Sequence, residues 1–459
     1  MLLETSKPLA KRCSPWWSLS MSLGAVTVLT VVPMVSLVAA PVEPSYANSA
    51  PSERTDVAAD SHAESSQVDA AEEKAVLAIK RAGYIVTRDE SGHVSRVSIA
   101  GRKLDEELMQ HVKNLPHLNH LGFCGAVIKG GYLAGLKNLR TLAFAQYGVF
   151  TKEAMKDLGG LTNLEELTGL PILIAYEARE GESEARWKWH RERIQGLTEA
   201  TAADLESLKG LPKLRLLGLR GYGITDAALG SLKSLSSLRE LRISYAPFTG
   251  VGLLNLRDLK QLRSLSIREG CPMTDDGLSH VATMTHIEVL NLDVRGITGT
   301  GLVHLKTLQH LHTLHLRGAH VTDASLENLK YLVHLKKLYL ARNKISDGTI
   351  RHLAPLTALE ELDLRHTGVT GASLARLKNL PKLRSLDLGN VTITDEHLSH
   401  LQEFPALEIL DLYDTGITFA GLKHLFRLKQ LKKLTVNARE VTEAGEAQLR
   451  RALPNCDVR

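Results

Sequence analysis

The chain has 459 residues, a net charge of +5 and 23% charged residues, with lysine and arginine interspersed among aspartate and glutamate. This mild, mixed charge lacks the basic block of a nucleic-acid-binding protein, so we expect no nucleic-acid partner. The cysteines at positions 13, 124, 271 and 456 are too scattered to indicate a disulfide framework or a metal site. The length would suit about three ordinary domains, unless the chain is repetitive.

Residues 1–40 have the layout of an export signal. Lys7, Lys11 and Arg12 precede an almost uncharged stretch over residues 18–40. This stretch is long enough to cross a bilayer of about 30 Å, so it is either a cleaved signal peptide or a retained membrane anchor. In both cases the sequence predicts an exported protein, periplasmic or extracellular, which in the second case is anchored through residues 18–40.

Two short segments follow the signal. Residues 41–72 are rich in alanine, serine, proline and acidic residues and poor in large apolar ones, which predicts a disordered linker. Residues 73–93 hold Val76 and Ile79 and then a short apolar stretch over residues 84–86, which predicts a polar-faced cap. Such a cap keeps the edge of a stacked core away from water.

Residues 94–213 hold four degenerate repeats, which begin at Val94, Leu118, Leu139 and Leu164. The interval from Leu164 to the next unit at Leu214 is 50 residues. It contains either an insertion near residues 170–196 or a second unit whose leucines have been lost. Trp187 and Trp189 lie there in a charged run, and insertions in repeat proteins often carry recognition. These tryptophans either contact a partner or pack back onto the repeats.

Ten regular repeats and a C-terminal cap occupy residues 214–459. The first apolar residue recurs every 24 residues, with one step of 25 after Leu262. These residues are Leu214, Leu238, Leu262, Ile287, Leu311, Leu335, Leu359, Leu383, Leu407 and Leu431. A fixed period of this length indicates a solenoid.

Each unit predicts one strand, one turn and one short helix. Leu386 and Leu388 alternate with polar residues, as in a strand with one buried face. Thr394 or Asp395 can then cap a turn, and Leu398 and Leu401 are three residues apart, as in a helical turn. No unit can bury its leucines alone, so the units stack with a parallel sheet on one side and the helices on the other.

The unit LKKLYLARNKISDGTIRHLAPLTA, which begins at Leu335, resembles the leucine-rich repeat family, and the resemblance covers most of the chain. It is similar to bacterial secreted repeat proteins and to the repeat half of eukaryotic F-box receptors. The resemblance implies an α/β solenoid, a horseshoe with a parallel concave sheet and short convex helices. It says little about the ligand.

The candidate binding surface is the concave face, where side chains between and after the strand leucines point away from the core. Asp363, Asp387 and Asp411 form an acidic column there, and like charges on neighbouring strands repel unless a cation relieves them. The column is therefore either a binding surface or a solvated face offset by Arg365 and Lys433. The predicted partner-binding residues are Arg317, Tyr339, Asp363, Arg365, Asp387, Asp411, Tyr413, Trp187 and Trp189.

Catalytic and metal-binding motifs are missing from the sequence. It has no phosphate-binding loop, nucleophile elbow or H-E-x-x-H motif, and we expect neither enzymatic activity nor a cofactor. Histidines such as His400 and His424 fill one repeat position, so no metal site is predicted. The sequence favours an exported or tethered protein-binding module, with an F-box-like substrate receptor or a structural envelope protein as alternatives.

Overall fold

A computed structural model describes residues 58–101, 104–145, 148–171, 201–437 and 442–459. The predicted signal, the start of the linker, Trp187 and Trp189 lie outside these residues. The chain divides into two units, Met1–His117 and Leu118–Arg459.

The first unit is built around the predicted cap. Helix α2 (Ala58–Arg81) precedes strand β1 (Ile85–Arg88), which pairs antiparallel with β2 (Val94–Ala100), and helix α3 (Glu106–Lys113) follows. Val76 and Ile79 are buried. The expectation of a disordered linker to residue 72 is wrong from residue 58 onward, because the alanines and glutamates of this stretch also favour a helix. Glu72 is 3% exposed, and its carboxylate accepts the Val94 N–H at 2.8 Å.

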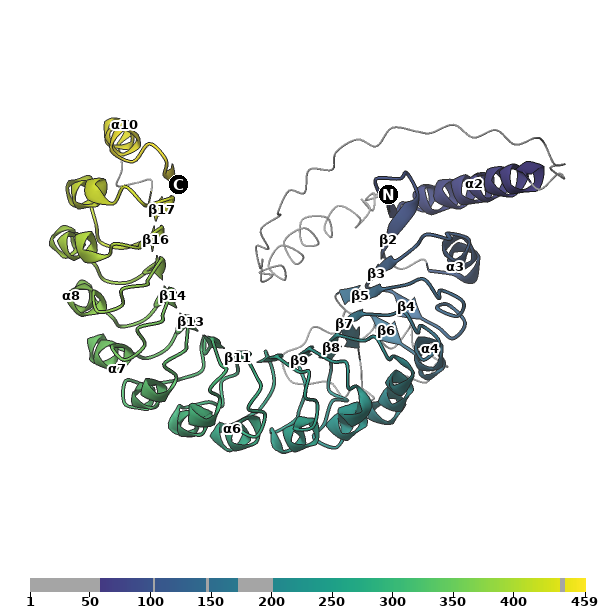
Figure 1. The fold of residues 1–459 in the computed structure, drawn as a ribbon, viewed down its shortest axis with the longest axis horizontal. Coiled ribbons are helices and arrows are strands. Elements are labelled where there is room, and N and C mark those ends of the chain that lie inside the picture. The colour runs from purple at the N-terminus through teal and green to yellow at the C-terminus, as the bar shows by residue number, and fades with distance from the viewer. Residues whose placement is uncertain (1–57, 102–103, 146–147, 172–200, 438–441) are drawn as a thin grey trace, which may run out of the picture. The chain divides into compact units, whose positions relative to one another are not determined.

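The second unit places its strands along the inner edge of an arc (Figure 1). Every neighbouring pair in the strand order from β3 to β18 is parallel. The strands are β3 (His120–Cys124), β5 (Thr141–Ala145), β7 (Glu166–Pro171), β8 (Leu216–Arg220), β9 (Glu240–Ser244), β10 (Ser264–Arg268), β11 (Val289–Asp293), β12 (Thr313–His315), β13 (Lys337–Tyr339), β14 (Glu361–Asp363), β15 (Ser385–Asp387), β16 (Ile409–Leu412), β17 (Lys433–Val436) and β18 (Asp457–Val458). A separate parallel pair joins β4 (Val127–Ile128) to β6 (Val149–Phe150).

Short helices line the outer edge of this arc, and most of them are 3-10 rather than α-helical (Figure 1). They bury leucines three residues apart, such as Leu398 and Leu401. The outer elements are α4 (Lys152–Leu158), η2 (Ala202–Gly210), η3 (Ala228–Ser234), η4 (Val251–Leu256), α6 (Asp275–Val281), η5 (Thr300–Thr307), η6 (Ser325–Tyr331), η7 (Asp347–Thr349), α7 (Ile350–Leu353), η8 (Gly371–Ser373), α8 (Leu374–Leu377), η9 (Asp395–Glu403), α9 (Phe419–Leu422), η10 (Lys423–Arg427) and α10 (Glu443–Ala452).

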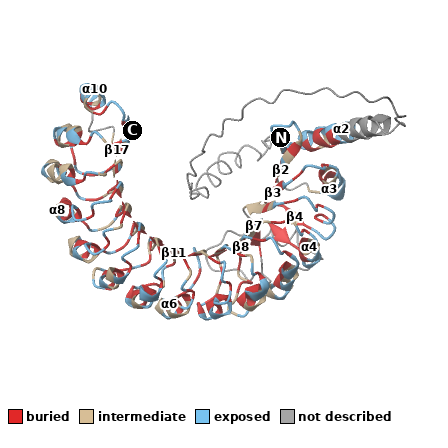
Figure 2. Ribbon diagram, in the orientation of Figure 1, coloured by how far each residue is buried: buried red, intermediate tan, exposed pale blue. Residues whose placement is uncertain are grey.

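The core of the second unit is a stack of leucines in register. Leu338, Leu362, Leu386 and Leu410 are successive partners across the sheet, and none is more than 2% exposed. Burying one leucine contributes about 1.5–3 kcal/mol, so the repeated leucines account for the stacking rather than for any ligand. Figure 2 shows buried residues in red along the strands and along the outer elements.

In several units, an aspartate that follows the Thr or Ser of the turn accepts hydrogen bonds from the next unit. Asp347 accepts the Thr370 N–H and the Thr370 hydroxyl, both at 2.7 Å, and also the Ser373 hydroxyl. Burial alone would raise the pKa of Asp347, but these hydrogen bonds lower it. Asp395, which the sequence suggested as a turn cap, likewise accepts the N–H and hydroxyl of Thr418 at 2.6 Å. These aspartates therefore act between units.

The long interval before Leu214 contributes no strand between its neighbours. β7 pairs directly with β8, with Leu167 opposite Leu217. A second repeat in this interval would have placed its own strand between these two. The described residues of this interval therefore contribute one strand, β7, and one outer element, η2.

Candidate functional site

The inner face of the sheet presents the strand residues that alternate with the buried leucines. On β14, Leu362 and Leu364 are buried in the core, so Asp363 between them points to the opposite face. Asp363 lies opposite Asp387, which in turn lies opposite Asp411. The predicted acidic column therefore exists, with its members on adjacent strands about 4.8 Å apart.

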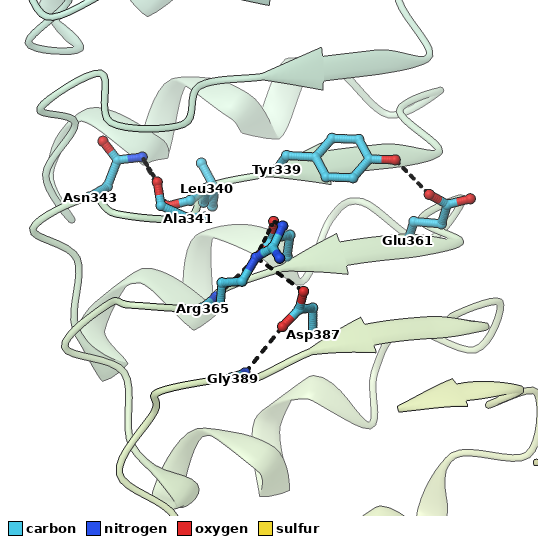
Figure 3. Close-up of polar contacts among 9 residues, drawn as sticks. Tyr339, Leu340, Ala341, Asn343, Glu361, Arg365, Asp387 and Gly389 are labelled. Atoms are coloured by element: carbon cyan, nitrogen blue, oxygen red, sulfur yellow. Dashed lines mark hydrogen bonds and ion pairs between the residues drawn. The ribbon is translucent and has the colours of Figure 1, made fainter. Parts of the chain in front are cut away.

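Arg365 joins the first two carboxylates of this column (Figure 3). Its Nη2 lies 2.8 Å from Asp363 Oδ2, and its Nε lies 3.1 Å from Asp387 Oδ2. The backbone N–H of Arg365 donates to Asp363 at 3.1 Å, and that of Gly389 donates to Asp387 at 3.1 Å. The structure thus brings Asp363, Arg365 and Asp387 together as one internal ion-pair network.

Burial and the repulsion between neighbouring carboxylates change the pKa values of groups in this network. Asp363 is only 4% exposed. Burial, followed by the negative charge of Asp363, raises the pKa of Asp387 to about 6, although Arg365 acts in the opposite direction. Burial would lower the pKa of Arg365, but its contacts with Asp363 raise it. Lys433, the other predicted compensating cation, makes no ion pair with any described residue.

Tyr339 belongs to a second internal cluster. The sequence suggested an exposed anchor, but Tyr339 is half-buried, and its hydroxyl donates to Glu361 at 2.6 Å. Lys337 donates to the same carboxylate at 2.5 Å. The ring of Tyr339 stacks on His315, with centroids 4.0 Å apart and planes 9° apart. Burial, followed by the charge of Arg268, lowers the pKa of His315 to about 4, so His315 is neutral at pH 7.

The third carboxylate of the column has a different setting. Asp411 accepts the Tyr413 N–H at 2.9 Å and makes no ion pair within the described residues. Ile409, at the start of β16, is 41% exposed, and Tyr413, directly after β16, is 53% exposed. Two large exposed side chains therefore flank a carboxylate that has no cation of its own.

The basic part of the inner face lies earlier in the sheet. Arg268 and the predicted Arg317 are both exposed, and neither forms an ion pair in the part of the chain that the structure describes. Arg268 ends β10 and Arg317 follows β12, two strands apart in the sheet. The inner face is therefore basic around Arg317 and acidic around Asp411.

Sequence reasoning missed Ile409, Glu361 and His315. Ile409 and Glu361 belong to another outward column of the sheet, two residues before the column of Asp363, Asp387 and Asp411. Lys337 and Ser385 belong to the same column as Ile409 and Glu361. Following the alternation of buried and outward residues one step toward the start of each strand would have identified Ile409 and Glu361. Apart from their equivalent positions in successive units, nothing in the sequence indicated that His315 stacks on Tyr339.

Among the described residues, no group of three or more histidine, cysteine, aspartate or glutamate side chains could hold a metal ion. No helix in the described ranges is both long and apolar enough to cross a membrane. Cys124, Cys271 and Cys456 are buried and form no disulfide among the described residues, and burial raises the pKa of Cys271 to about 11.

A model of the family described as "Leucine rich repeat" matches residues 309–369, which include Arg317, Tyr339, Asp363 and Arg365. A search of the curated proteins finds no match.

Three solved structures are similar to the chain. An internalin from Listeria monocytogenes is 19% identical, with 74% of this chain and 86% of that chain covered and a TM-score of 0.39. A repeat protein from Leptospira interrogans is 18% identical, with coverages of 80% and 89% and a TM-score of 0.45. A TLR13 chain from a complex with ssRNA13 is 22% identical, with coverages of 74% and 45% and a TM-score of 0.47.

Proposed function

Because its 24-residue units and the matching family model identify the chain as a leucine-rich repeat protein, we propose that it is a non-enzymatic module that binds another protein. The contact surface is the inner face of the sheet from β12 to β17. The observation that carries this proposal is the exposure of Tyr413 and Ile409, at 53% and 41%, on either side of Asp411. Exposed aromatic and aliphatic side chains beside charged groups are typical anchors of protein interfaces.

The rest of the inner face supports this role in two ways. The networks around Arg365 and Tyr339 hold their side chains in place before any partner binds, which lowers the entropy lost on association. Arg317 and Asp411 give the face two regions of opposite charge, which would orient a partner of complementary charge. Trp187 and Trp189 remain predicted partner-binding residues outside the described part of the chain.

We propose that the protein acts outside the cytoplasm. The support is the sequence alone, in which Lys7, Lys11 and Arg12 precede the apolar stretch over residues 18–40. The protein is then either released after cleavage or anchored through that stretch. Two other functions are compatible with the repeats: a cytoplasmic substrate receptor of the F-box kind and a structural element of the cell envelope. Protease treatment of intact cells separates the first, because a cytoplasmic receptor would be protected.

Site-specific photo-crosslinking in the protein's own cells tests protein binding. A photoreactive residue at Arg317 or Ser385, both on the inner face, should capture a discrete protein. The matched controls place it at Asp276 on α6 and Glu327 on η6, which are exposed on the outer side. Equal capture from all four positions, or from the outer positions alone, would refute the inner face as the contact surface.

A further inference from the structure

The exposed face of β15 and β16 has one repeat position where a side chain is missing. Arg365 follows β14, Gly389 follows β15 and Tyr413 follows β16, each 24 residues after the previous one. These three residues share one outward column of the sheet. Gly389 therefore leaves a space between Arg365 and the exposed ring of Tyr413.

At the neighbouring pair of carboxylates, Asp363 and Asp387, the equivalent repeat position holds an arginine, Arg365. Asp363 and Asp387 are opposite each other on β14 and β15, and the Arg365 guanidinium lies 2.8 Å from the first and 3.1 Å from the second. Asp387 and Asp411 repeat this register on β15 and β16. The residue equivalent to Arg365 for this second pair is Gly389, which supplies no cation.

Oxygen atoms surround the position that a Gly389 side chain would take. A Cβ atom added there would lie 3.4 Å from Asp387 Oδ1, 3.5 Å from the Tyr413 carbonyl oxygen and 3.7 Å from Asp411 Oδ1. These are ordinary van der Waals distances, so a side chain can start from this position without displacing its neighbours. The lining is electronegative, and it therefore complements a cationic group.

We infer that this face docks an arginine side chain of a protein partner, with its guanidinium above Gly389 between Asp387 and Asp411. The inference rests on the proposed function and specifies its contact. A guanidinium fits better than an ammonium, because its planar fork can reach both carboxylates while stacking on the ring of Tyr413. Ile409, on the other side of Asp411, offers an apolar contact to a residue next to the partner's arginine.

The inference is tested with two peptides and the full chain. The probes are the peptide acetyl-Leu-Arg-Gly-amide and its citrulline counterpart, which has nearly the same shape but no charge. Binding is followed by NMR through the backbone amides of Gly389 and Tyr413. We expect the arginine peptide to shift both amides in a saturable manner and the citrulline peptide to bind at least about tenfold more weakly. Calcium ions serve as a third probe and should not reproduce the shifts.

The decisive variant is Gly389→Arg, which places a guanidinium in the space from within the chain. It should fold normally and lose the response of the Tyr413 amide to the arginine peptide. Asp411→Asn should weaken the same response. Ser244→Arg is the matched control, because it adds the same side chain to the equivalent repeat position at the end of β9, far from the acidic pair. That variant should bind the peptide like the unaltered chain.

Several outcomes would overturn the inference. Equal binding of the arginine and citrulline peptides, shifts reproduced by calcium ions, or an undiminished response in Gly389→Arg would each remove the arginine site. If photo-crosslinking from Arg317 and Ser385 captures a partner that Gly389→Arg still binds fully, this inference fails while protein binding stands. If the arginine peptide binds as expected but crosslinking captures nothing, the site stands and the proposed function fails.

Discussion

Replacing Asp387 with asparagine should stabilise the protein at pH 8 and have little effect near pH 4. Burial and the neighbouring Asp363 raise the folded-state pKa of Asp387 from 3.8 to about 6. The folded state therefore keeps this proton at pH values where the unfolded chain has already lost it. Stability falls as the pH rises through this window, and the full cost of the charged carboxylate is present above about pH 6. An asparagine has no such cost at any pH.

The size of the effect follows from the pKa difference. A rise from 3.8 to about 6 corresponds to about 3 kcal/mol for a fully shielded group. The Asp387 side chain keeps 22% of its exposure, and solvent screening reduces the expected gain to about 1–2 kcal/mol. This gain is net of the ion pair with Arg365, because that contact already lowers the pKa.

Urea unfolding of the two proteins at pH 8, 6 and 4 measures this difference. The midpoint of Asp387→Asn should exceed that of the unaltered chain at pH 8, and the two should converge at pH 4. Asp276→Asn, at an exposed position on α6, controls for the substitution itself. If Asp387→Asn were less stable at pH 8 and equal at pH 4, Asp387 would be a net stabilising partner of Arg365, and the reasoning would be refuted.

Three other substitutions test the internal contacts. Arg365→Ala should lower the free energy of unfolding by about 3–5 kcal/mol, because it leaves the buried Asp363 without its cation. Adding Asp363→Asn to this variant should restore part of the urea midpoint, and no recovery would contradict the pairing of Arg365 with Asp363. Asp347→Ala should cost about 1.5–3 kcal/mol by removing the hydrogen bonds to the next unit, and an unchanged melting temperature would argue against that link. Asn343 is 4% exposed, and its side chain accepts the Val321 N–H at 3.1 Å and donates to the Leu316 carbonyl at 2.6 Å. Asn343→Ala should therefore cost about 2–3 kcal/mol and speed hydrogen exchange at the Val321 amide; unaltered exchange would contradict this role.

The fold was predictable because every unit repeats the same two periodicities. The strand leucines and the outer leucines fix the buried face of each element, and stacking is the only way to bury both. What could not be predicted was the fine structure of the outer side. The choice between α and 3-10 helix is made in elements of three to ten residues, where one hydrogen bond decides the geometry. The alanines and glutamates of residues 58–72 also suit both a linker and a helix.

The candidate site was predictable as columns but not as contacts. The register placed Asp363, Asp387 and Asp411 on adjacent strands, as the structure has them. Which of them has a cation depends on side-chain conformations, and Arg365 turns toward the first two. Tyr339 is half-buried for the same reason, since it packs on His315 on the neighbouring strand. Side-chain packing between strands therefore decides which carboxylates of the column have a cation beside them.

Carboxyl footprinting with the crosslinked partner tests most directly whether the inner face binds protein. A carbodiimide and a small amine label exposed carboxylates, and mass spectrometry reads each site with and without the partner. If the inner face is the contact surface, the bound partner protects Asp411, while Asp276 and Glu327 on the outer side label as before. Protection of the two outer residues with unchanged labelling of Asp411 would contradict it.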